Sequence, residues 1–197
     1  MRWIALILAA AGSIWAFGFQ NPAPSSAQAG TAIRMDVEQL VDGADRIVQG
    51  RISGRRTVRD HLGRVVTDYE MDVERTFLGE PAETRTIRMP GGVTAEGRGM
   101  VLPGMPQIQV GEEVVLFLNG EGMQLPTGLA QGKYRVLSTA HGSQQVMQST
   151  GSLELVGAAS HQHGAVTSMS YSEFSGRVQA RVTERLFRES YGSETNR

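Results

Sequence analysis

The clearest pattern in the chain is the alternation of apolar and acidic residues in "VVTDYEMDVERTFLG", residues 65–79. Successive side chains of a strand point to opposite faces, so this period of two predicts a strand with one buried and one solvated face. The expected buried face holds Val65, Thr67, Tyr69, Met71, Val73 and Phe77, and the solvated face holds Asp68, Glu70, Asp72 and Glu74. On neighbouring strands, the arginines expected to pair with these acids across the sheet are Arg46, Arg85 and Arg88.

Shorter apolar runs between glycine and proline turns predict the remaining strands, at residues 45–58, 84–89 and 132–139. The run Val114–Leu118 is apolar at every position, which is typical of a strand buried on both faces. Residues 144–148 and 152–156 are expected to add a hairpin.

Capping signals predict one helix near each end of the mature chain. Asp36 followed by Gln39 is a capping-box variant before a short apolar face, and Ser170 followed by Glu173 is a second capping box. The apolar stripe expected for the C-terminal helix is Phe174, Val178, Val182 and Phe187.

These elements predict a mainly β fold, a small antiparallel OB-like barrel of five or more strands with short N-terminal and C-terminal helices. The expected order is a signal peptide at 1–29, a β-barrel domain at 30–156, a linker loop at 157–169, a C-terminal helix at 170–188 and a polar tail at 189–197.

The first residues indicate the compartment. Arg2 precedes an apolar run from Trp3 to Phe19, and Ala27–Ala29 matches the small-residue pattern cut by signal peptidase. We therefore predict an exported protein, periplasmic or secreted, whose mature chain begins at Gly30. An uncleaved N-terminal anchor is the alternative, and contact with a membrane is expected only in that case.

Composition narrows the function classes. The 197-residue chain has 19 basic and 20 acidic residues, so no basic footprint for nucleic acid is present, and aromatic residues make up only 6%. Cysteine is absent, which excludes disulfides and thiol nucleophiles. The sequence also lacks a Gly-x-Ser-x-Gly motif and a phosphate-binding glycine loop. We predict a non-enzymatic protein without a cofactor.

Five segments carry a family resemblance: "ADRIVQGRI", "YEMDVERTFLGE", "TIRMPGG", "VGEEVVLFL" and "GLAQGKYRV". Over residues 44–136 they resemble an exported bacterial domain of unknown function, and their layout is similar to the netrin-type module, the OB-fold barrel of tissue inhibitors of metalloproteinases. Those inhibitors use an N-terminal cysteine to chelate the protease zinc, and Gly30 stands at that place here. The resemblance implies the barrel, and an inhibitor or accessory partner of a secreted protease is one alternative function.

The aperiodic segment from Gly91 to Pro106 is the main candidate for a binding surface, because loops on a rigid barrel commonly carry binding. We predict contact with a protein partner there. The alternative is a lid that covers the barrel end. The residues predicted to form the surface are Gly91, Gly92, Met100, Leu102, Met105, Gly132 and Lys133.

The motif "SHQHG" supports a second function class. His161 and His163 are spaced as a pair of metal ligands, and a third ligand would have to come from His61, His141 or a carboxylate. With a third ligand, the chain would be a metal-binding protein or a metal-dependent hydrolase. Without it, the two histidines belong to a surface loop.

Overall fold

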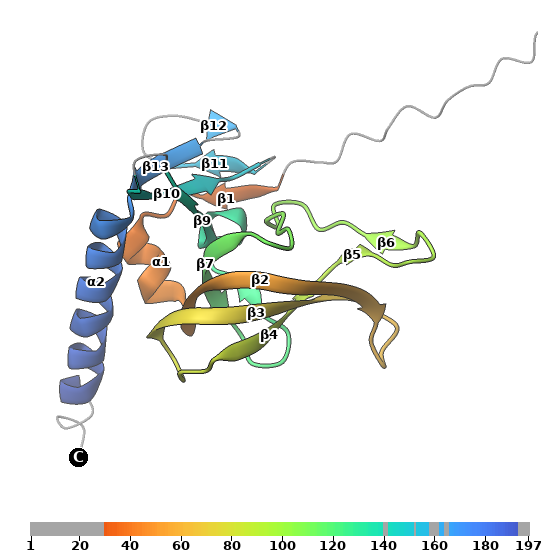
Figure 1. Ribbon diagram of the computed structural model, residues 1–197, viewed down its shortest axis with the longest axis horizontal. Coiled ribbons are helices and arrows are strands. Elements are labelled where there is room, and N and C mark those ends of the chain that lie inside the picture. Colours follow the sequence, from red (N-terminus) through yellow and green to blue (C-terminus); the bar gives the residue numbers. More distant parts are fainter. Residues whose placement is uncertain (1–29, 140–141, 152, 158–161, 164–165, 193–197) are drawn as a thin grey trace, which may run out of the picture.

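An eight-stranded antiparallel sheet forms the centre of the computed structural model, which describes residues 30–139, 142–151, 153–157, 162–163 and 166–192 (Figure 1). The strand order is β13-β10-β9-β7-β2-β3-β4, and β8 pairs with β7. The strands of this sheet are β2 (Arg46–Arg59), β3 (Val65–Leu78), β4 (Thr84–Pro90), β7 (Glu113–Asn119), β8 (Leu125–Pro126), β9 (Lys133–Ser138), β10 (Gln144–Ser149) and β13 (Val166–Ser170).

Two smaller sheets and three helical segments complete the fold. The order β1-β11-β12 makes a three-stranded sheet, and β5 pairs with β6 in a short hairpin. Their bounds are β1 (Thr31–Ile33), β5 (Gly92–Val93), β6 (Gly99–Met100), β11 (Glu154–Val156) and β12 (Gln162–His163), with helices α1 (Val37–Gly43), α2 (Tyr171–Gly192) and the 3-10 turn η1 (Leu129–Gly132). The prediction of a mainly β, antiparallel fold with a helix near each end is confirmed.

Strand β7 is the central strand of the core. Val114 to Leu118 are fully buried on both faces, as the apolar run predicts. Val115 and Phe117 pack against the helices, with Tyr134 and Phe174. Val114, Leu116 and Leu118 face the other way and pack with residues of β2, β3 and β4 and with Ile108. Helices α1 and α2 therefore cover one face of the sheet. On the other face, side chains of β2, β3, β4 and β7 form a second apolar cluster with Ile108.

Strand β3 departs from strict alternation in its first half. Val66 and Asp68 are buried although the pattern places them on the solvated face. Arg88 on β4 explains Asp68, because its guanidinium donates to both carboxylate oxygens, with Nε–Oδ1 at 2.7 Å and Nη2–Oδ2 at 2.8 Å. The pairing predicted for Arg88 is thus confirmed. The hydrogen bond from Arg88 holds the pKa of Asp68 below its usual value despite burial.

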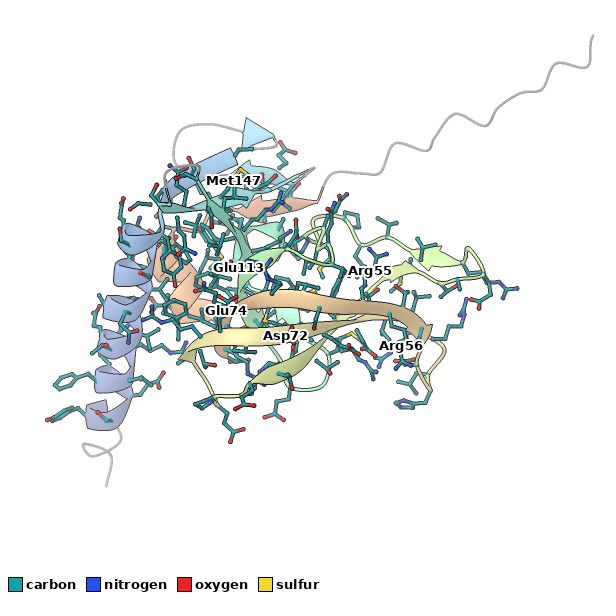
Figure 2. The ribbon with its side chains drawn as sticks, viewed as in Figure 1. Arg55, Arg56, Asp72, Glu74, Glu113 and Met147 are labelled. Carbon is teal, nitrogen blue, oxygen red and sulfur yellow. The ribbon has the colours of Figure 1, made fainter. Side chains whose placement is uncertain are left out.

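The rest of the acidic face has partners other than those predicted. Asp72 accepts a hydrogen bond from Ser53 at 3.2 Å, and Arg85 donates to the backbone carbonyl of Glu80 at 2.8 Å. Glu74 faces Glu113 on β7, with the charge of Arg51 nearby, and Figure 2 shows both acids near Asp72. Partial burial, followed by repulsion from Glu113, raises the pKa of Glu74.

Both predicted helix caps are present. Asp36 and Gln39 form the complete capping box of α1, and Ser170 Oγ accepts from the Glu173 backbone N–H at 3.2 Å. The C-terminal helix extends to Gly192, so residues 189–192, predicted as polar tail, continue α2. Phe174, Val178 and Val182 are buried as predicted.

Phe187 was wrongly placed in the buried stripe. It is 59% exposed and stacks on Tyr191, with ring centroids 4.4 Å apart. The reason is the helical period, because Phe187 comes nine residues after Val178 and therefore lies about 180° around the helix from it. Near the end of α1, Arg185 donates to the carbonyls of Val41 and Ala44 and satisfies backbone acceptors that the short helix leaves free.

Residues 144–156 do not form a hairpin. Strand β10 pairs with β9 and β13, whereas β11 runs parallel to β1 and pairs with β12. The predicted linker at 157–169 likewise contains β12 and most of β13, which forms one edge of the main sheet. Within the described residues, no helix is long and apolar enough to cross a membrane.

Candidate functional site

The structure divides the predicted binding surface into two places. Gly91, Gly92 and Met100 belong to or border the β5–β6 hairpin, which extends beside the far ends of β2 and β3 (Figure 1). Met105 and Lys133 instead line a cavity of about 360 Å³ on the face of the sheet opposite the helices. We call this cavity the Lys133 cavity.

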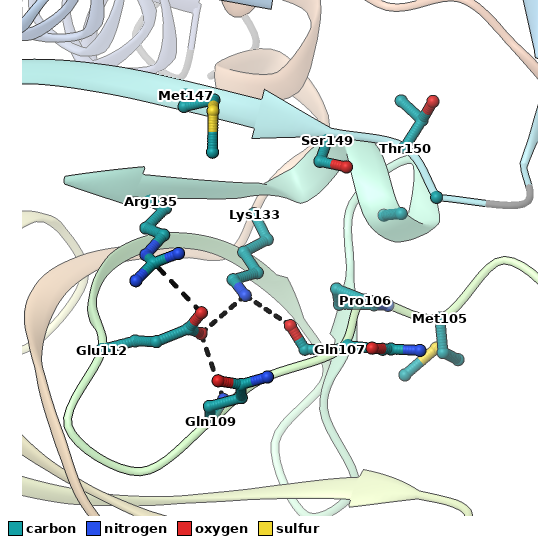
Figure 3. Close-up of a pocket in the computed structure, with 12 residues that line it drawn as sticks. Met105, Pro106, Gln107, Gln109, Glu112, Lys133, Arg135, Met147, Ser149 and Thr150 are labelled. Carbon is teal, nitrogen blue, oxygen red and sulfur yellow. Dashed lines mark hydrogen bonds and ion pairs between the residues drawn. The ribbon is translucent and has the colours of Figure 1, made fainter. Parts of the chain in front are cut away.

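The period of two along β9 and β10 decides which side chains reach the Lys133 cavity. Tyr134 and Val136 on β9 point toward the helices. Lys133 and Arg135 therefore point the other way, into the cavity, and Met147 stands beside Arg135 as its cross-strand partner. The segment before β7 closes the opposite side. The remaining lining residues are Pro106, Gln107, Gln109, Glu112, Ala130, Ser149, Thr150 and Gly151, and most are drawn with their labels in Figure 3.

Glycine 132 places Lys133 at the start of β9. A Cβ at this position would lie 2.4 Å from the Thr127 carbonyl oxygen and 3.1 Å from that of Phe117. Only glycine allows the chain to pass so close to the backbone of β7 and of Thr127, the residue after β8. Gly132 is buried and is not among the cavity residues, so its role is to position Lys133.

A nearly buried ion pair lies at the base of the cavity. Lys133 Nζ is 2.7 Å from Glu112 Oε2, and the two side chains are 13% and 9% exposed. Lys133 also donates to the Gln107 carbonyl oxygen, and the Gln109 backbone N–H donates to Glu112 Oε2 at 3.1 Å (Figure 3). Burial by itself raises the pKa of Glu112, but the hydrogen bonds from Lys133 and Gln109 outweigh it and lower that pKa.

Arg135 is less closely paired with Glu112 than Lys133 is, and its side chain is more exposed. Its Nε lies 3.7 Å from Glu112 Oε1, beyond hydrogen-bond distance, and the side chain is 45% exposed. Glu112 is already bound by two shorter contacts, so it satisfies Arg135 only in part. The guanidinium, drawn beside Glu112 in Figure 3, therefore keeps hydrogen-bond donors that this ion pair does not use.

The cavity surface around these charges is mixed. Met105, Pro106, Ala130 and Met147 supply apolar contacts, and the side chains of Gln107, Gln109 and Ser149 supply hydrogen-bonding groups. Such a site can hold an anionic group against Arg135 and an apolar group beside it.

Sequence reasoning found Met105 and Lys133 but not Glu112, Arg135 or Met147. One feature of the sequence could have indicated Arg135. Lys133 is the only lysine of the chain, and Arg135 two residues later lies on the same side of a strand. Glu112 comes from a turn 21 residues earlier, and only the pairing of β7 with β9 brings it to Lys133.

The metal hypothesis falls largely outside the described residues. His141, His161 and the side chain of His163 are not described, and the backbone of His163 pairs with Glu154 in β12. His61 lies in the exposed turn between β2 and β3. Among described residues, no group of three histidines or carboxylates is arranged to hold a metal. A site built on His161 and His163 stays a prediction.

Comparison of the chain with protein families, with curated proteins and with solved structures finds no match. Its function is therefore inferred from the cavity and the surfaces themselves.

Proposed function

We propose that this protein is an exported, non-enzymatic binding domain and that the Lys133 cavity receives a segment of a protein partner. The segment carries a carboxylate next to an apolar side chain. Its carboxylate pairs with Arg135, and its apolar group contacts Met105 and Met147.

The half-exposed guanidinium of Arg135 carries this proposal. Bidentate pairing with a carboxylate is the geometry that arginine favours, and the 3.7 Å contact with Glu112 does not use it. Met147 is its neighbour across the β9–β10 pair, so an apolar contact lies beside the charge. A volume of about 360 Å³ is within the ordinary range for ligand sites and accommodates a few side chains.

The ion pair of Lys133 favours binding over catalysis. Lys133 Nζ donates to both Glu112 and the Gln107 carbonyl, so its donors are already used in contacts within the protein. Glu112 is the one carboxylate among the described residues that line the cavity, and its hydrogen bonds from Lys133 and the Gln109 N–H lower its pKa, which makes it a weaker base.

Affinity capture with the full chain tests this function. Wild-type protein and the Arg135→Gln and Arg188→Gln variants are incubated with the envelope fraction of the source cells. Losing a charged hydrogen-bond donor at the centre of a site costs about tenfold or more in affinity, so Arg135→Gln should release the partner. Arg188→Gln removes the same charge from the exposed end of α2 and should retain the partner. Equal capture by all three proteins, or turnover of an envelope substrate, would contradict the proposal.

The OB-like barrel is part of the same proposal. It is supported by the way β2, β3, β4 and β7 enclose one apolar cluster, and by register shifts that interrupt the pairing of β2 with β3. The role as an inhibitor or partner of a secreted protease stays an alternative, and a protease among the captured proteins would favour it.

A further inference from the structure

A charge imbalance marks the end of the molecule farthest from α2. We define the arm as residues 54–68 and 88–101, which form the far ends of β2 and β3 and the β5–β6 hairpin (Figure 1). The arm holds six arginines and three carboxylates, although the whole chain has 19 basic and 20 acidic residues. The arm is thus positive on a nearly neutral protein.

Most of this positive charge is free to act on a partner. Two arm arginines are neutralised, since Arg64 pairs with Asp60 and Arg88 pairs with Asp68. The other four form no ion pair with a carboxylate of the described residues, although Arg59 donates to the Gly63 carbonyl. All four are exposed: Arg55, Arg56, Arg59 and Arg98. Figure 2 shows Arg55 and Arg56 on opposite sides of β2.

Exposed aliphatic side chains accompany the arginines. Val101 is 75% exposed, Val93 and Met100 are exposed on the same hairpin, and Leu62 is exposed in the turn between β2 and β3. Both hairpins project to the same end of the molecule (Figure 1). Arginines and aliphatic residues together at a protruding end are typical of proteins that lie against a lipid surface.

The two hairpins form one unit. Thr57, Val58 and Arg59 of β2 line an open groove together with Thr94, Glu96 and Arg98 of the β5–β6 hairpin. Arg59 and Arg98 therefore flank the same groove from different hairpins. Glu96 is the only arm carboxylate without an arginine ion pair in the described residues.

We propose that the arm docks on an anionic lipid surface, with its arginines on the headgroup phosphates and Leu62, Val93 and Val101 in the interfacial layer. The aliphatic residues belong to two separate hairpins, Leu62 to the turn after β2 and Val93 and Val101 to the β5–β6 hairpin and its base, and they do not line one apolar pocket, as a specific protein partner would need. This contact is independent of the Lys133 cavity.

The absence of cysteine allows a site-specific test on the full chain. A bimane fluorophore is attached to the single cysteine of a Val101→Cys variant, and the protein is mixed with vesicles of phosphatidylglycerol and phosphatidylcholine or of phosphatidylcholine alone. We expect a blue shift only with the anionic vesicles. A label at Leu186→Cys, on the exposed end of α2, should not shift. Residues 1–29 are present in every sample, so differences between samples report on the labelled position.

Charge variants of the labelled protein complete the test. Each arginine near an anionic surface strengthens binding about fivefold, so Arg59→Gln with Arg98→Gln should weaken vesicle binding about 25-fold. Arg188→Gln should leave binding unchanged, and thermal unfolding of each variant confirms its fold. No shift with anionic vesicles, or an equal shift with both kinds, would overturn the proposal. So would a shift with soluble polyglutamate alone, which would assign the arm to an acidic protein.

Discussion

At the residue scale, Gly92, one of the positions predicted to bind a partner, also has a packing role. Its φ is +122°, and a Cβ there would lie 2.2 Å from Thr67 Oγ1 and 2.8 Å from Thr57 Cγ2. The hydroxyls of Thr57 and Thr67 are 2.9 Å apart, and Thr67 donates to the Gly91 carbonyl at 2.7 Å. Gly92 thus lets the β5–β6 hairpin lie directly against β2 and β3.

Replacing Gly92 with alanine should destabilise the protein by about 2 kcal/mol, because the new methyl group clashes and the backbone conformation is strained. Gly97→Ala is the matched control. Gly97 also has a positive φ, +76°, but a Cβ there meets nothing within 4 Å, so only backbone strain of about 1 kcal/mol is added. Chemical denaturation of both variants measures the difference. Equal losses would show that Gly92 has no packing role.

The Glu112–Lys133 pair gives stability a defined pH dependence. The pKa of Glu112 is lowered from its usual 4.5 in the folded protein, so its contribution is complete above 4.5 and is lost as the pH falls through the lower native value. Glu112→Gln leaves Lys133 without its anion and should cost about 3 kcal/mol at neutral pH. Thermal unfolding of both proteins across this range should show the gap closing below pH 4.5. A gap independent of pH would contradict this assignment.

At the element scale, helix α2 is held by an aromatic cluster. Phe174 is fully buried, with its ring centroid 4.6 Å from that of Tyr134 and 6.2 Å from that of Phe117. Tyr134 is also held by Gln148, whose Nε2 is 3.0 Å from its hydroxyl, and burial raises the pKa of that hydroxyl. The first half of α2 is therefore part of the core.

Alanine substitutions of a buried and an exposed phenylalanine on α2 test whether the first half of this helix is part of the core. Phe174→Ala should lower the free energy of unfolding by about 3–5 kcal/mol, since it removes a buried ring from the core. Phe187→Ala should change it by less than about 0.5 kcal/mol, because Phe187 is exposed on the side of α2 opposite its buried face. Urea denaturation distinguishes the two. A large loss on Phe187→Ala would mean that another surface covers the end of α2.

Helices and strands were predicted correctly from the sequence where a regular pattern of apolar residues or a local capping motif marks them. Val114–Leu118 and the Asp36 capping box were predicted correctly because apolar runs and local hydrogen bonds act within a few residues. The predictions of strand pairing and burial were wrong where contacts between residues distant in the sequence determine the structure. Strand β11 leaves β10 and joins β1, more than 120 residues earlier, and Asp68 is buried because Arg88 reaches across from β4. The candidate site depends on the same kind of contact, which explains why Lys133 was found and Glu112 was missed.

At the scale of the whole molecule, the helices, the Lys133 cavity and the arm occupy three separate places. The helices cover one face of the sheet, the Lys133 cavity opens on the other, and the arm projects away from α2 (Figure 1). The two proposed contacts, a protein segment in the cavity and lipid at the arm, therefore do not overlap, and we expect them to be independent. Arg135→Gln should abolish partner capture and leave vesicle binding intact, whereas the double variant at Arg59 and Arg98 should do the reverse.

The central claim is that the Lys133 cavity is the binding site, and methionine resonances test it most directly. Met105 and Met147 line the cavity, whereas Met100 lies on the arm, so methyl-labelled methionine reports on both places in one spectrum. The full chain is titrated with short peptides that end in an apolar residue with a free carboxylate, and with the same peptides amidated. We predict that Met105 and Met147 shift with the free carboxylates only and lose this response in Arg135→Gln. Unchanged Met105 and Met147 resonances, or equal shifts with the amidated peptides, would contradict the account.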